Sequence, residues 1–408
     1  MTRKRRQMKS EIKRITVIVA VFFVLALNWF VFAIAADLSE TAIEKIPAEK
    51  WPVFEDDEDL RLLADAVTAS ITYYERLPGE KAFLYGPDRY TARVLGAGLR
   101  RFRDFLDTGP EPAAIDEFIR ENGSVYAHHE SGRLVDILFT GYYEPGVSGS
   151  LTPSEQYPYP VYGRPDDLAV IQLSAFALQC GPKTLVGRYD GREVVPYFDR
   201  SEIDGGALKG RAAPIAWVSD PVSLFFLHVQ GSGKVILEDG RRINLHYDTS
   251  NGLAYKSIGK YLIDGGKIAA PEMSMQKIAA YIRANPGETK EILHYNPRYI
   301  FFKTSEHGIR GCINVPLTSG RSVALDQGVS PPGALLFMES SKPVCNETGD
   351  IEKWIGFSRF GLNQDTGSAI RGAKRADLFW GSGDYAEIAA GHMKHPGRLY
   401  YITIRPGE

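Results

Sequence analysis

The stretch that decides this fold is QDTGSAIRG at residues 364–372, followed by RADLFWGSG at residues 375–383. It holds two aspartates, Asp365 and Asp377, twelve positions apart. The apolar segment from residue 376 to 380 predicts a strand, with Asp377 on one face and Trp380 on the other. A carboxyl group among apolar neighbours keeps its proton to a higher pH, because burial disfavours the charged form. Asp377 is therefore a candidate general acid.

Aspartate is also a common residue of turns, so a structural role stays open for either of these two side chains.

The composition of the whole chain limits the classes of protein to which it can belong. The 408 residues carry a formal net charge of −2, which argues against a general nucleic-acid-binding protein. The length allows two or three domains. With 40 glycines, 21 tyrosines and 20 phenylalanines, the chain favours strands and turns.

The N-terminal segment predicts a membrane anchor. Residues 1–14 are rich in lysine and arginine, and an uncharged apolar run follows at residues 15–36. About 20 such residues cross a bilayer as a helix, and the basic cluster favours a cytoplasmic N-terminal side. The run is longer than most signal-peptide cores, so we favour an uncleaved anchor over cleavage near Ala35. Residues 37–55 are expected to form a linker.

Metal-ligand spacing is absent from the sequence. Cys180, Cys312 and Cys345 form no metal motif, and both a Cys312–Cys345 disulfide and free thiols stay open. His392 and His395 lie three positions apart, but no third ligand accompanies them. We therefore expect no metal and no cofactor.

The middle of the chain differs in character from its two ends. Helical periodicity predicts three helices between residues 57 and 123, and a strand then runs into TGYYEP at residues 140–145. From residue 149 to about 269 the segments are short and separated by turns, with a hairpin around residue 239. This pattern predicts a separate β domain. Strands return after residue 299, and a capping box from Asp384 to Glu387 predicts one short helix among them.

Three further motifs offer groups that could bind a ligand. TGYY at residues 140–143 places alternate side chains on one face of a strand. VQGSG at residues 229–233 combines an amide side chain with glycines that let the backbone approach a ligand, and DTSNG at residues 248–252 follows it. Packing of the tyrosines and a tight turn at the glycines are the structural alternatives. The candidate binding residues are Thr140, Tyr142, Gln230, Gly231, Ser232 and Asn251.

Together these motifs resemble those of the MltA family of lytic murein transglycosylases, whose C-terminal part is called the 3D domain after three aspartates. The matching positions are Asp326 in VALD, Asp365 in QDTG and Asp377 in RADLF. TGYY, VQGSG and NG with its following YKSIG also match, in the family's order. The resemblance covers most of the chain after residue 130.

This resemblance implies a mainly β protein with short helices, built from a double-psi β-barrel and an inserted smaller β domain. The barrel would take residues 56–145 and 290–408, with the 3D domain at about 320–405. The insert would take residues 146–289. A groove between the two domains would hold a glycan strand.

The family's reaction cleaves the β-1,4 bond between N-acetylmuramic acid and N-acetylglucosamine in peptidoglycan without water, and it leaves 1,6-anhydro ends. The C6 hydroxyl of the substrate is the nucleophile, so one carboxyl group can act first as acid and then as base. By position this group would be Asp377. Asp365 would order the site or bind a sugar hydroxyl. Asp326 would lie along the groove, more in a structural role than in contact with the sugar.

Two other functions stay open: a hydrolase that uses Asp365 and Asp377 as a pair, and a non-catalytic glycan-binding module. The expected location is the periplasm of a Gram-negative envelope, with residues 15–36 in the inner membrane, or export after cleavage. No cysteine follows the apolar run, so a lipoprotein signal is not expected. Expected partners are peptidoglycan strands, the membrane, and cell-wall synthesis or division proteins, but not nucleic acid.

Overall fold

Six strands close into a barrel in the computed structural model, which describes residues 42–176, 184–367 and 369–407. Their order is β17–β18–β16–β19–β6–β20, and β20 pairs with β17 as well as with β6, which closes the ring. Two pairs are parallel, β16 with β18 and β19 with β6. The strands are β6 (Ile137–Glu144), β16 (Ser322–Ala324), β17 (Leu335–Cys345), β18 (Ile351–Asp365), β19 (Arg375–Ser382) and β20 (Lys394–Ile404). The predicted mainly β fold with a barrel is confirmed.

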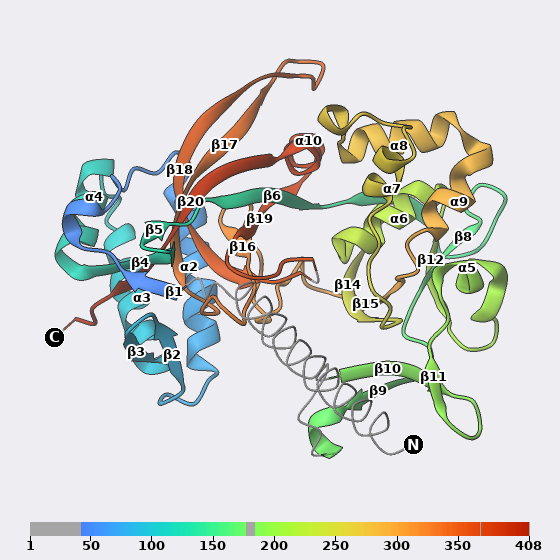
Figure 1. Cartoon of the computed structure of the whole chain (residues 1–408), viewed down its shortest axis with the longest axis horizontal. Helices are drawn as coiled ribbons and strands as arrows, with labels where there is room; N and C mark the ends of the chain where they lie inside the picture. Colours follow the sequence, from blue (N-terminus) through green and yellow to red (C-terminus); the bar gives the residue numbers. More distant parts are fainter. Residues whose placement is uncertain (1–41, 177–183, 368, 408) are drawn as a thin grey trace, which may run out of the picture.

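The N-terminal elements of the described chain cover the outside of this barrel (Figure 1). Three helices form as the periodicity predicted, and the apolar stripe of the first one packs into the barrel's core through Leu63 and Val67. Strand β4 extends the barrel sheet beside β20, and β1 pairs with β4. The elements are β1 (Ala42–Lys45), α2 (Leu60–Glu75), β2 (Ala82–Tyr85), β3 (Asp88–Thr91), α3 (Ala92–Leu106), α4 (Pro112–Asn122) and β4 (Gly123–Glu130).

A second sheet of six strands makes up the insert, to the right of the barrel in Figure 1. Its order is β15–β14–β13–β7–β12–β8, and the predicted hairpin is confirmed as β13–β14. Because β15 pairs with β14, this sheet continues to Ser305, past residue 289, where the sequence placed its end. The strands are β7 (Gly146–Ser150), β8 (Tyr159–Tyr162), β12 (Pro214–Val218), β13 (Ser232–Leu237), β14 (Arg242–Ser250) and β15 (Ile300–Ser305).

Four short helices build a separate apolar core within the insert. Ser257 and Ser274 cap two of them, because each hydroxyl oxygen accepts a hydrogen bond from a backbone N–H of the first turn. These helices are α6 (Pro221–Gln230), α7 (Ile258–Asp264), α8 (Met275–Ala284) and α9 (Thr289–His294). A small sheet of β9 (Leu168–Gln172), β10 (Thr184–Tyr189) and β11 (Val194–Pro196) stands at the lower end of the insert (Figure 1).

The expected capping box at residues 384–387 is wrong. Helix α10 (Asp384–His392) begins at Asp384 itself, and its N-cap is Gly383, whose φ of 94° and ψ of 179° favour glycine. Asp384 therefore lies in the first turn, where its charge faces the positive end of the helix dipole. The predicted anchor at residues 15–36 lies outside the described residues. Within the part that is described, no helix is long and apolar enough to cross a membrane.

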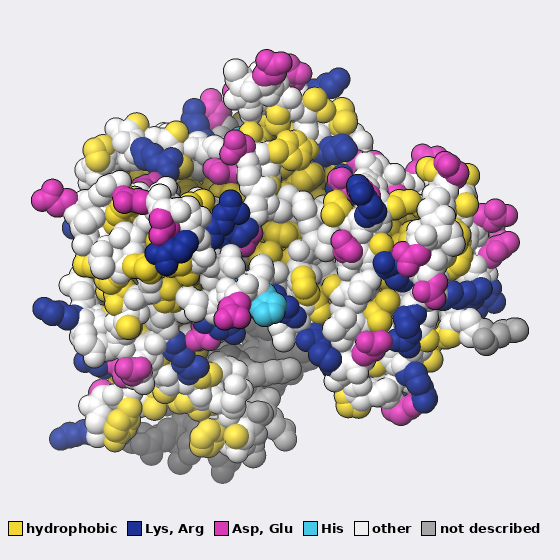
Figure 2. Space-filling model, turned by 180° about the vertical axis from the view of Figure 1, so that it is seen from behind, with side chains coloured by type: hydrophobic (Ala, Val, Ile, Leu, Met, Phe, Trp, Pro, Cys, Tyr) yellow, Lys and Arg dark blue, Asp and Glu magenta, His cyan; other side chains and the backbone are white. Residues whose placement is uncertain are grey.

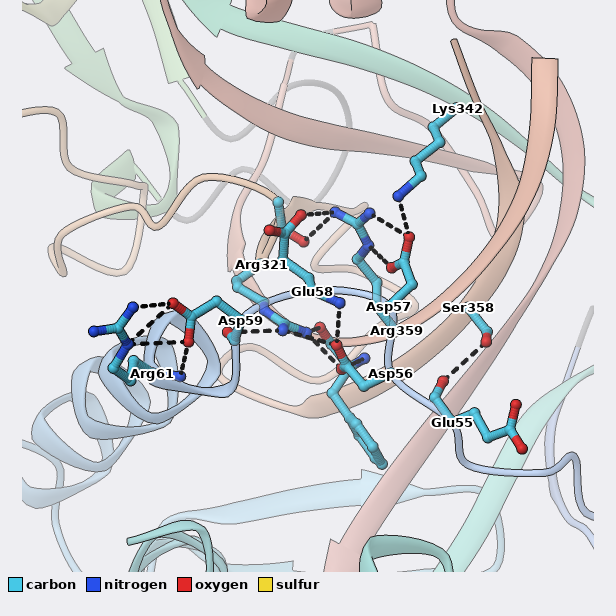
Figure 3. A network of polar contacts seen from close by, with 12 residues as sticks. Glu55, Asp56, Asp57, Glu58, Asp59, Arg61, Arg321, Lys342, Ser358 and Arg359 are labelled. Carbon is cyan, nitrogen blue, oxygen red and sulfur yellow. Dashed lines mark hydrogen bonds and ion pairs between the residues drawn. The ribbon is translucent and has the colours of Figure 1, made fainter. Parts of the chain in front are cut away.

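A run of acidic residues before α2 binds a buried arginine of the barrel (Figure 3). The side chains of Arg321 and Asp56 are 0% and 1% exposed, and two nitrogens of Arg321 bond the two carboxylate oxygens at 2.6 and 2.8 Å. The guanidinium also donates to the carbonyl oxygens of Phe360 and Asp59. Because Arg321 directly precedes β16, this bidentate pair fixes the shortest strand of the barrel.

A second arginine extends the same network along β18. Arg359 is 1% exposed and bonds Asp57 at 2.8 Å and Glu58 at 3.2 Å. Burial raises the pKa of Asp57, but Arg359 and the neighbouring Lys342 outweigh burial and hold this pKa below its usual value. Asp57 is thereby held as a carboxylate, and its bonds to Arg359 and Lys342 tie the segment before α2 to β18 and β17.

The buried pair predicts a large effect on stability. Arg321→Met should lower the free energy of unfolding by about 3–5 kcal/mol, because Asp56 stays buried without its cation. Chemical denaturation followed by circular dichroism measures this change. Arg61→Met in the same network is the control, since the Arg61 side chain is 90% exposed and should give no measurable change. Equal stability of both variants would show that the buried pair does not hold the strand.

Candidate active site

Two aspartates flank one residue of the shortest barrel strand. Ala324 of β16 pairs with Asp365 on β18 and with Asp377 on β19. Neighbouring strands lie about 4.8 Å apart, so the Cα atoms of the two aspartates are about 10 Å apart. The barrel therefore brings together the two acids that the sequence singled out.

Asp377 accepts hydrogen bonds from two side chains. The hydroxyl of Thr140, its direct partner on β6, donates to Oδ1. Arg375 donates from Nε to the same oxygen at 3.2 Å and from Nη2 to the Thr140 hydroxyl at 3.3 Å. The side chain is 18% exposed. Burial raises the pKa of Asp377 above its usual value, although Arg375 lowers it.

Asp365 is held by one side-chain donor and one backbone donor. The Tyr142 hydroxyl donates to Oδ2 at 3.0 Å, and the backbone N–H of Cys312 donates to Oδ1 at 3.0 Å. Burial raises the pKa of Asp365 to about 6 even though these bonds lower it, and the nearby charge of Asp377 raises it further. The Tyr142 ring lies 5.2 Å from that of Phe379, between centroids. An acid fixed by two donors suits an orienting role.

Asp326 holds a loop together. Its Oδ2 accepts from the backbone N–H of Gly372 at 2.7 Å, and its Oδ1 accepts from Gly328 at 2.9 Å. The first bond ties the segment between β18 and β19 to the turn after β16. Both carboxylate oxygens therefore serve the backbone, which agrees with the structural role suggested for this third aspartate.

The VQGSG segment lies where the barrel passes into the insert. Gln230 ends α6, and its Oε1 accepts from the backbone N–H of Tyr143 at 3.3 Å. Gly231 caps the helix at φ 75°, a left-handed conformation that favours glycine. Ser232 begins β13 and is half-buried. The motif is thus joined to the residue directly after Tyr142, next to the aspartate pair.

Beside this motif, Glu144 links the two domains. Its carboxylate is 5% exposed, bonds Lys234 of the insert at 2.6 Å and accepts from the Ser382 hydroxyl of the barrel at 2.8 Å. One buried acid at the end of β6 therefore fixes the end of β19, the strand that carries Asp377, to β13.

The predicted contact of Asn251 with a ligand is not supported. This side chain is fully buried. Its Nδ2 donates to the carbonyl oxygens of Phe198 at 3.0 Å and Pro297 at 2.8 Å. Its Oδ1 accepts from Tyr299 at 3.0 Å and Leu253 at 3.4 Å. All its polar atoms serve the protein backbone, so Asn251 shapes the segment that follows it.

That segment carries a residue that the sequence did not single out. Tyr255 is 40% exposed, and Arg375 of the barrel lowers its pKa while burial raises it. Tyr247 of the insert is 47% exposed. Burial lowers the pKa of Arg298, Tyr247 raises it, and Arg371 of the barrel lowers it. Tyr247 and Tyr255 are thus two exposed tyrosines of the insert, and the charge of Arg375 in the barrel reaches the second of them. Strand alternation puts residues 375 and 377 on one face, a signal that could have identified Arg375.

The cysteines and histidines that were considered as metal ligands have other surroundings in the structure. Cys312 and Cys345 are free thiols, so of the two alternatives the disulfide is wrong, while Cys180 lies outside the described residues. His392 bonds its own helix, and the His395 ring lies 3.9 Å from that of Trp354. Among the described residues, no group of three or more His, Cys, Asp or Glu side chains is placed to hold a metal ion.

Fold and site together define a two-domain, mainly β protein with two partly buried aspartates on a closed barrel. Family models match both parts: the MltA specific insert domain at residues 138–303 and the 3D domain at residues 321–403. Membrane-bound lytic murein transglycosylase A of Escherichia coli strain K12 is 30% identical over 335 residues, which cover 81% of this chain and 79% of the relative. The chain belongs to the MltA family of lytic murein transglycosylases.

Other relatives agree. The enzyme of the same name from Vibrio cholerae is 30% identical over 299 residues, 72% of each chain. A membrane-bound lytic murein transglycosylase from Agrobacterium tumefaciens has a similar structure, with a TM-score of 0.72, 28% identity and coverage of 89% of this chain and 98% of that one. The structure of E. coli MltA with bound chitohexaose has a TM-score of 0.68, 25% identity and coverage of 90% and 95%.

The contacts of Asp365 predict a measurable titration. Tyr142→Phe should raise the pKa of Asp365 above its value of about 6, because the variant removes a hydrogen bond that favours the charged form. NMR of carbon-13-labelled aspartate carboxyl groups across pH reports this pKa. Tyr385→Phe is the control, since its hydroxyl bonds Pro343. A lower or unchanged pKa in Tyr142→Phe would show that this hydroxyl does not stabilise the carboxylate.

Proposed function

We propose that this chain is a lytic murein transglycosylase, a lyase that cleaves the β-1,4 bond between N-acetylmuramic acid and N-acetylglucosamine in peptidoglycan and leaves 1,6-anhydro ends. The observation that carries the proposal is the Asp377 carboxyl group, buried and raised in pKa within a chain of the MltA family. The bound chitohexaose of the E. coli structure supports a glycan as ligand.

In the proposed reaction, Asp377 acts twice. As an acid it gives its proton to the glycosidic oxygen, which leaves with the N-acetylglucosamine as the bond to C1 of the muramic acid breaks. As a carboxylate it then takes the proton of the C6 hydroxyl while O6 bonds to C1. The protonated acid is restored, and no water is consumed. Attack from within the same sugar gains effective concentration, so a second side chain is not needed to position a nucleophile.

The other residues have supporting roles in this proposal. Thr140 and Arg375 orient Asp377 through the bonds described above. Asp365 accepts a hydrogen bond from a hydroxyl group of the sugar, and the Tyr142 hydroxyl holds the Asp365 carboxylate in place. Tyr247 and Tyr255 offer exposed rings on which sugar faces can pack. On the face shown in Figure 2, cationic and acidic side chains are intermixed, which suits an uncharged glycan chain better than a nucleic acid.

Replacing the acid tests its role. Asp377→Asn should fold as the wild type does and lose activity on purified peptidoglycan by ~10² to 10⁴ or more, because the group is both acid and base. The control Asp264→Asn changes an exposed carboxylate paired with Lys260 and should stay active. Near wild-type turnover in folded Asp377→Asn would remove this residue from the mechanism.

The products separate the proposal from its alternatives. Mass spectrometry of digested peptidoglycan should find 1,6-anhydro-muramic ends, in the presence of a chelator as in its absence. Reducing muramic ends would identify a hydrolase in which water attacks with Asp365 as the second carboxylate. Binding of the glycan without any new ends would identify a non-catalytic module. Loss of activity with the chelator would show that the reaction needs a metal.

The contact of Arg375 with Asp377 predicts that replacing this arginine shifts the pH profile of kcat/KM. Because Arg375 lowers the pKa of Asp377, Arg375→Gln should raise that pKa and keep the acid protonated to higher pH. The alkaline limb of kcat/KM should therefore move to higher pH. Lys374→Gln makes the same charge change at a side chain that pairs with Glu130 and should leave the limb in place. A limb that does not move in Arg375→Gln would separate this arginine from the acid.

We also propose that residues 15–36 anchor the chain in the inner membrane, with the catalytic part in the periplasm, where cell-wall synthesis or division proteins would be its partners. The support is the basic cluster followed by an uncharged run of spanning length. N-terminal sequencing of the membrane fraction should find the intact start of the chain. A mature protein that begins near Ala36 and fractionates as soluble would rule the anchor out.

A further inference from the structure

The small sheet of β9, β10 and β11 has one face turned toward the insert. Direct partners in antiparallel strands point the same way, so the register assigns each side chain to a face. On the inner face, Leu168 and Val186 pack into an apolar cluster of the insert. Arg188 of the same face lies over the ring of Phe198, 4.4 Å from its centroid. The protein itself therefore covers this face at Leu168, Val186 and Arg188, while Val170 on the same face is 36% exposed.

The outer face of this sheet is uncharged throughout. Leu185 is 45% exposed, Tyr189 is 65% exposed and Val194 is 49% exposed. Monomeric proteins rarely leave such a continuous apolar group in water without a use for it. In Figure 2, hydrophobic side chains gather at the lower left, the end of the insert that carries the sheet. The members of the outer face are Ala169, Ile171, Leu185, Gly187, Tyr189, Val194 and Pro196.

The length of the chain outside the structure indicates what meets this face. Five residues, 37–41, separate the apolar run at residues 15–36 from Ala42, where the described chain begins. Even fully extended, such a connection spans about 20 Å. A body tethered so closely to a membrane-spanning segment stays at the membrane surface, so one of its faces meets the bilayer. An uncharged face is the least costly one to place there.

Two more features favour the lipid surface over a protein partner. Tyr189 stands among aliphatic side chains, and tyrosine is enriched at the membrane–water interface because its ring is apolar and its hydroxyl polar. The β2–β3 hairpin lies along the same lower side of the molecule in Figure 1 as the small sheet. Its Leu84 is 66% exposed. The hairpin and the small sheet thus lie toward the same side in this view, and each carries an exposed apolar residue.

We propose that the outer face of β9–β10–β11 rests on the periplasmic leaflet of the membrane that holds residues 15–36. The proposal rests on the anchor proposed above. Docking through a sheet of the insert, in addition to the tether at the barrel's end, sets the orientation of the whole molecule. The aspartate pair is then presented at a fixed height above the membrane rather than anywhere within reach of a free tether.

Cross-linking of the full-length protein tests this contact. The photoreactive amino acid p-benzoylphenylalanine is placed at Tyr189, and the protein is reconstituted into vesicles of phosphatidylethanolamine and phosphatidylglycerol. Irradiation should give lipid adducts at this position. The control is the same amino acid at Tyr385 on the barrel, which is 45% exposed and should give none. Adducts to a second copy, to residues 15–36 of its own chain, or to no partner would overturn the proposal.

A charged variant separates docking from anchoring. Leu185→Asp with Val194→Asp should lose the lipid adduct at position 189 while the protein stays in the vesicles through residues 15–36. An unchanged thermal unfolding curve shows that the variant is folded. Retention of the adduct would contradict docking through this face. Release of the wild type from vesicles with an intact N-terminus would instead refute the anchor, and activity on soluble glycan strands would still test the proposed reaction by itself.

Discussion

The buried ion pair of Arg321 with Asp56 is the interaction on which the site depends. Strand β16 has only three residues, so its own main-chain bonds cannot fix its position. The guanidinium on the residue before it is held by a carboxylate with almost no exposure, and the carbonyl oxygen of Arg321 accepts from Leu362 on β18 at 2.8 Å. A buried pair tolerates little displacement, because either charge alone would be costly. Ala324 of the same strand is therefore fixed in position, and so are Asp365 and Asp377, which pair with it.

A site fixed in this way can draw its parts from distant regions of the chain. Thr140 and Asp377 are 237 positions apart in sequence but are direct partners in the barrel. The insert begins directly after β6, so a movement of the insert would act on the strand that carries Thr140 and Tyr142. Glu144 resists such a movement with one bond to each domain. The barrel positions the acids, and the insert carries the exposed tyrosines Tyr247 and Tyr255.

Local patterns predicted much of this arrangement but not its long-range pairing. The alternation at residues 376–380 placed Asp377 on a strand, and Leu378 and Trp380 do pack into the core on its other face. No pattern could show that Ala324 pairs with both aspartates, because strand register between distant segments is set by tertiary packing. Asn251 shows a second limit: a motif marks a residue as needed without saying whether the ligand or the backbone needs it. The N-cap at Gly383 has no side chain, so a pattern of side-chain capping residues cannot predict it.

The same two forces shift the pKa values of this protein's acids in opposite directions. In the segment before α2, arginine outweighs burial, and the pKa of Asp57 falls. At the barrel site burial outweighs the hydrogen bonds, and the pKa of Asp365 rises to about 6. Burial also raises the pKa of Asp377, and one arginine opposes that rise. A glycan that covers this carboxyl group would exclude water and strengthen both effects. Arg375 then limits how far the pKa rises, which in the proposed reaction would leave Asp377 able both to give its proton and to take one back.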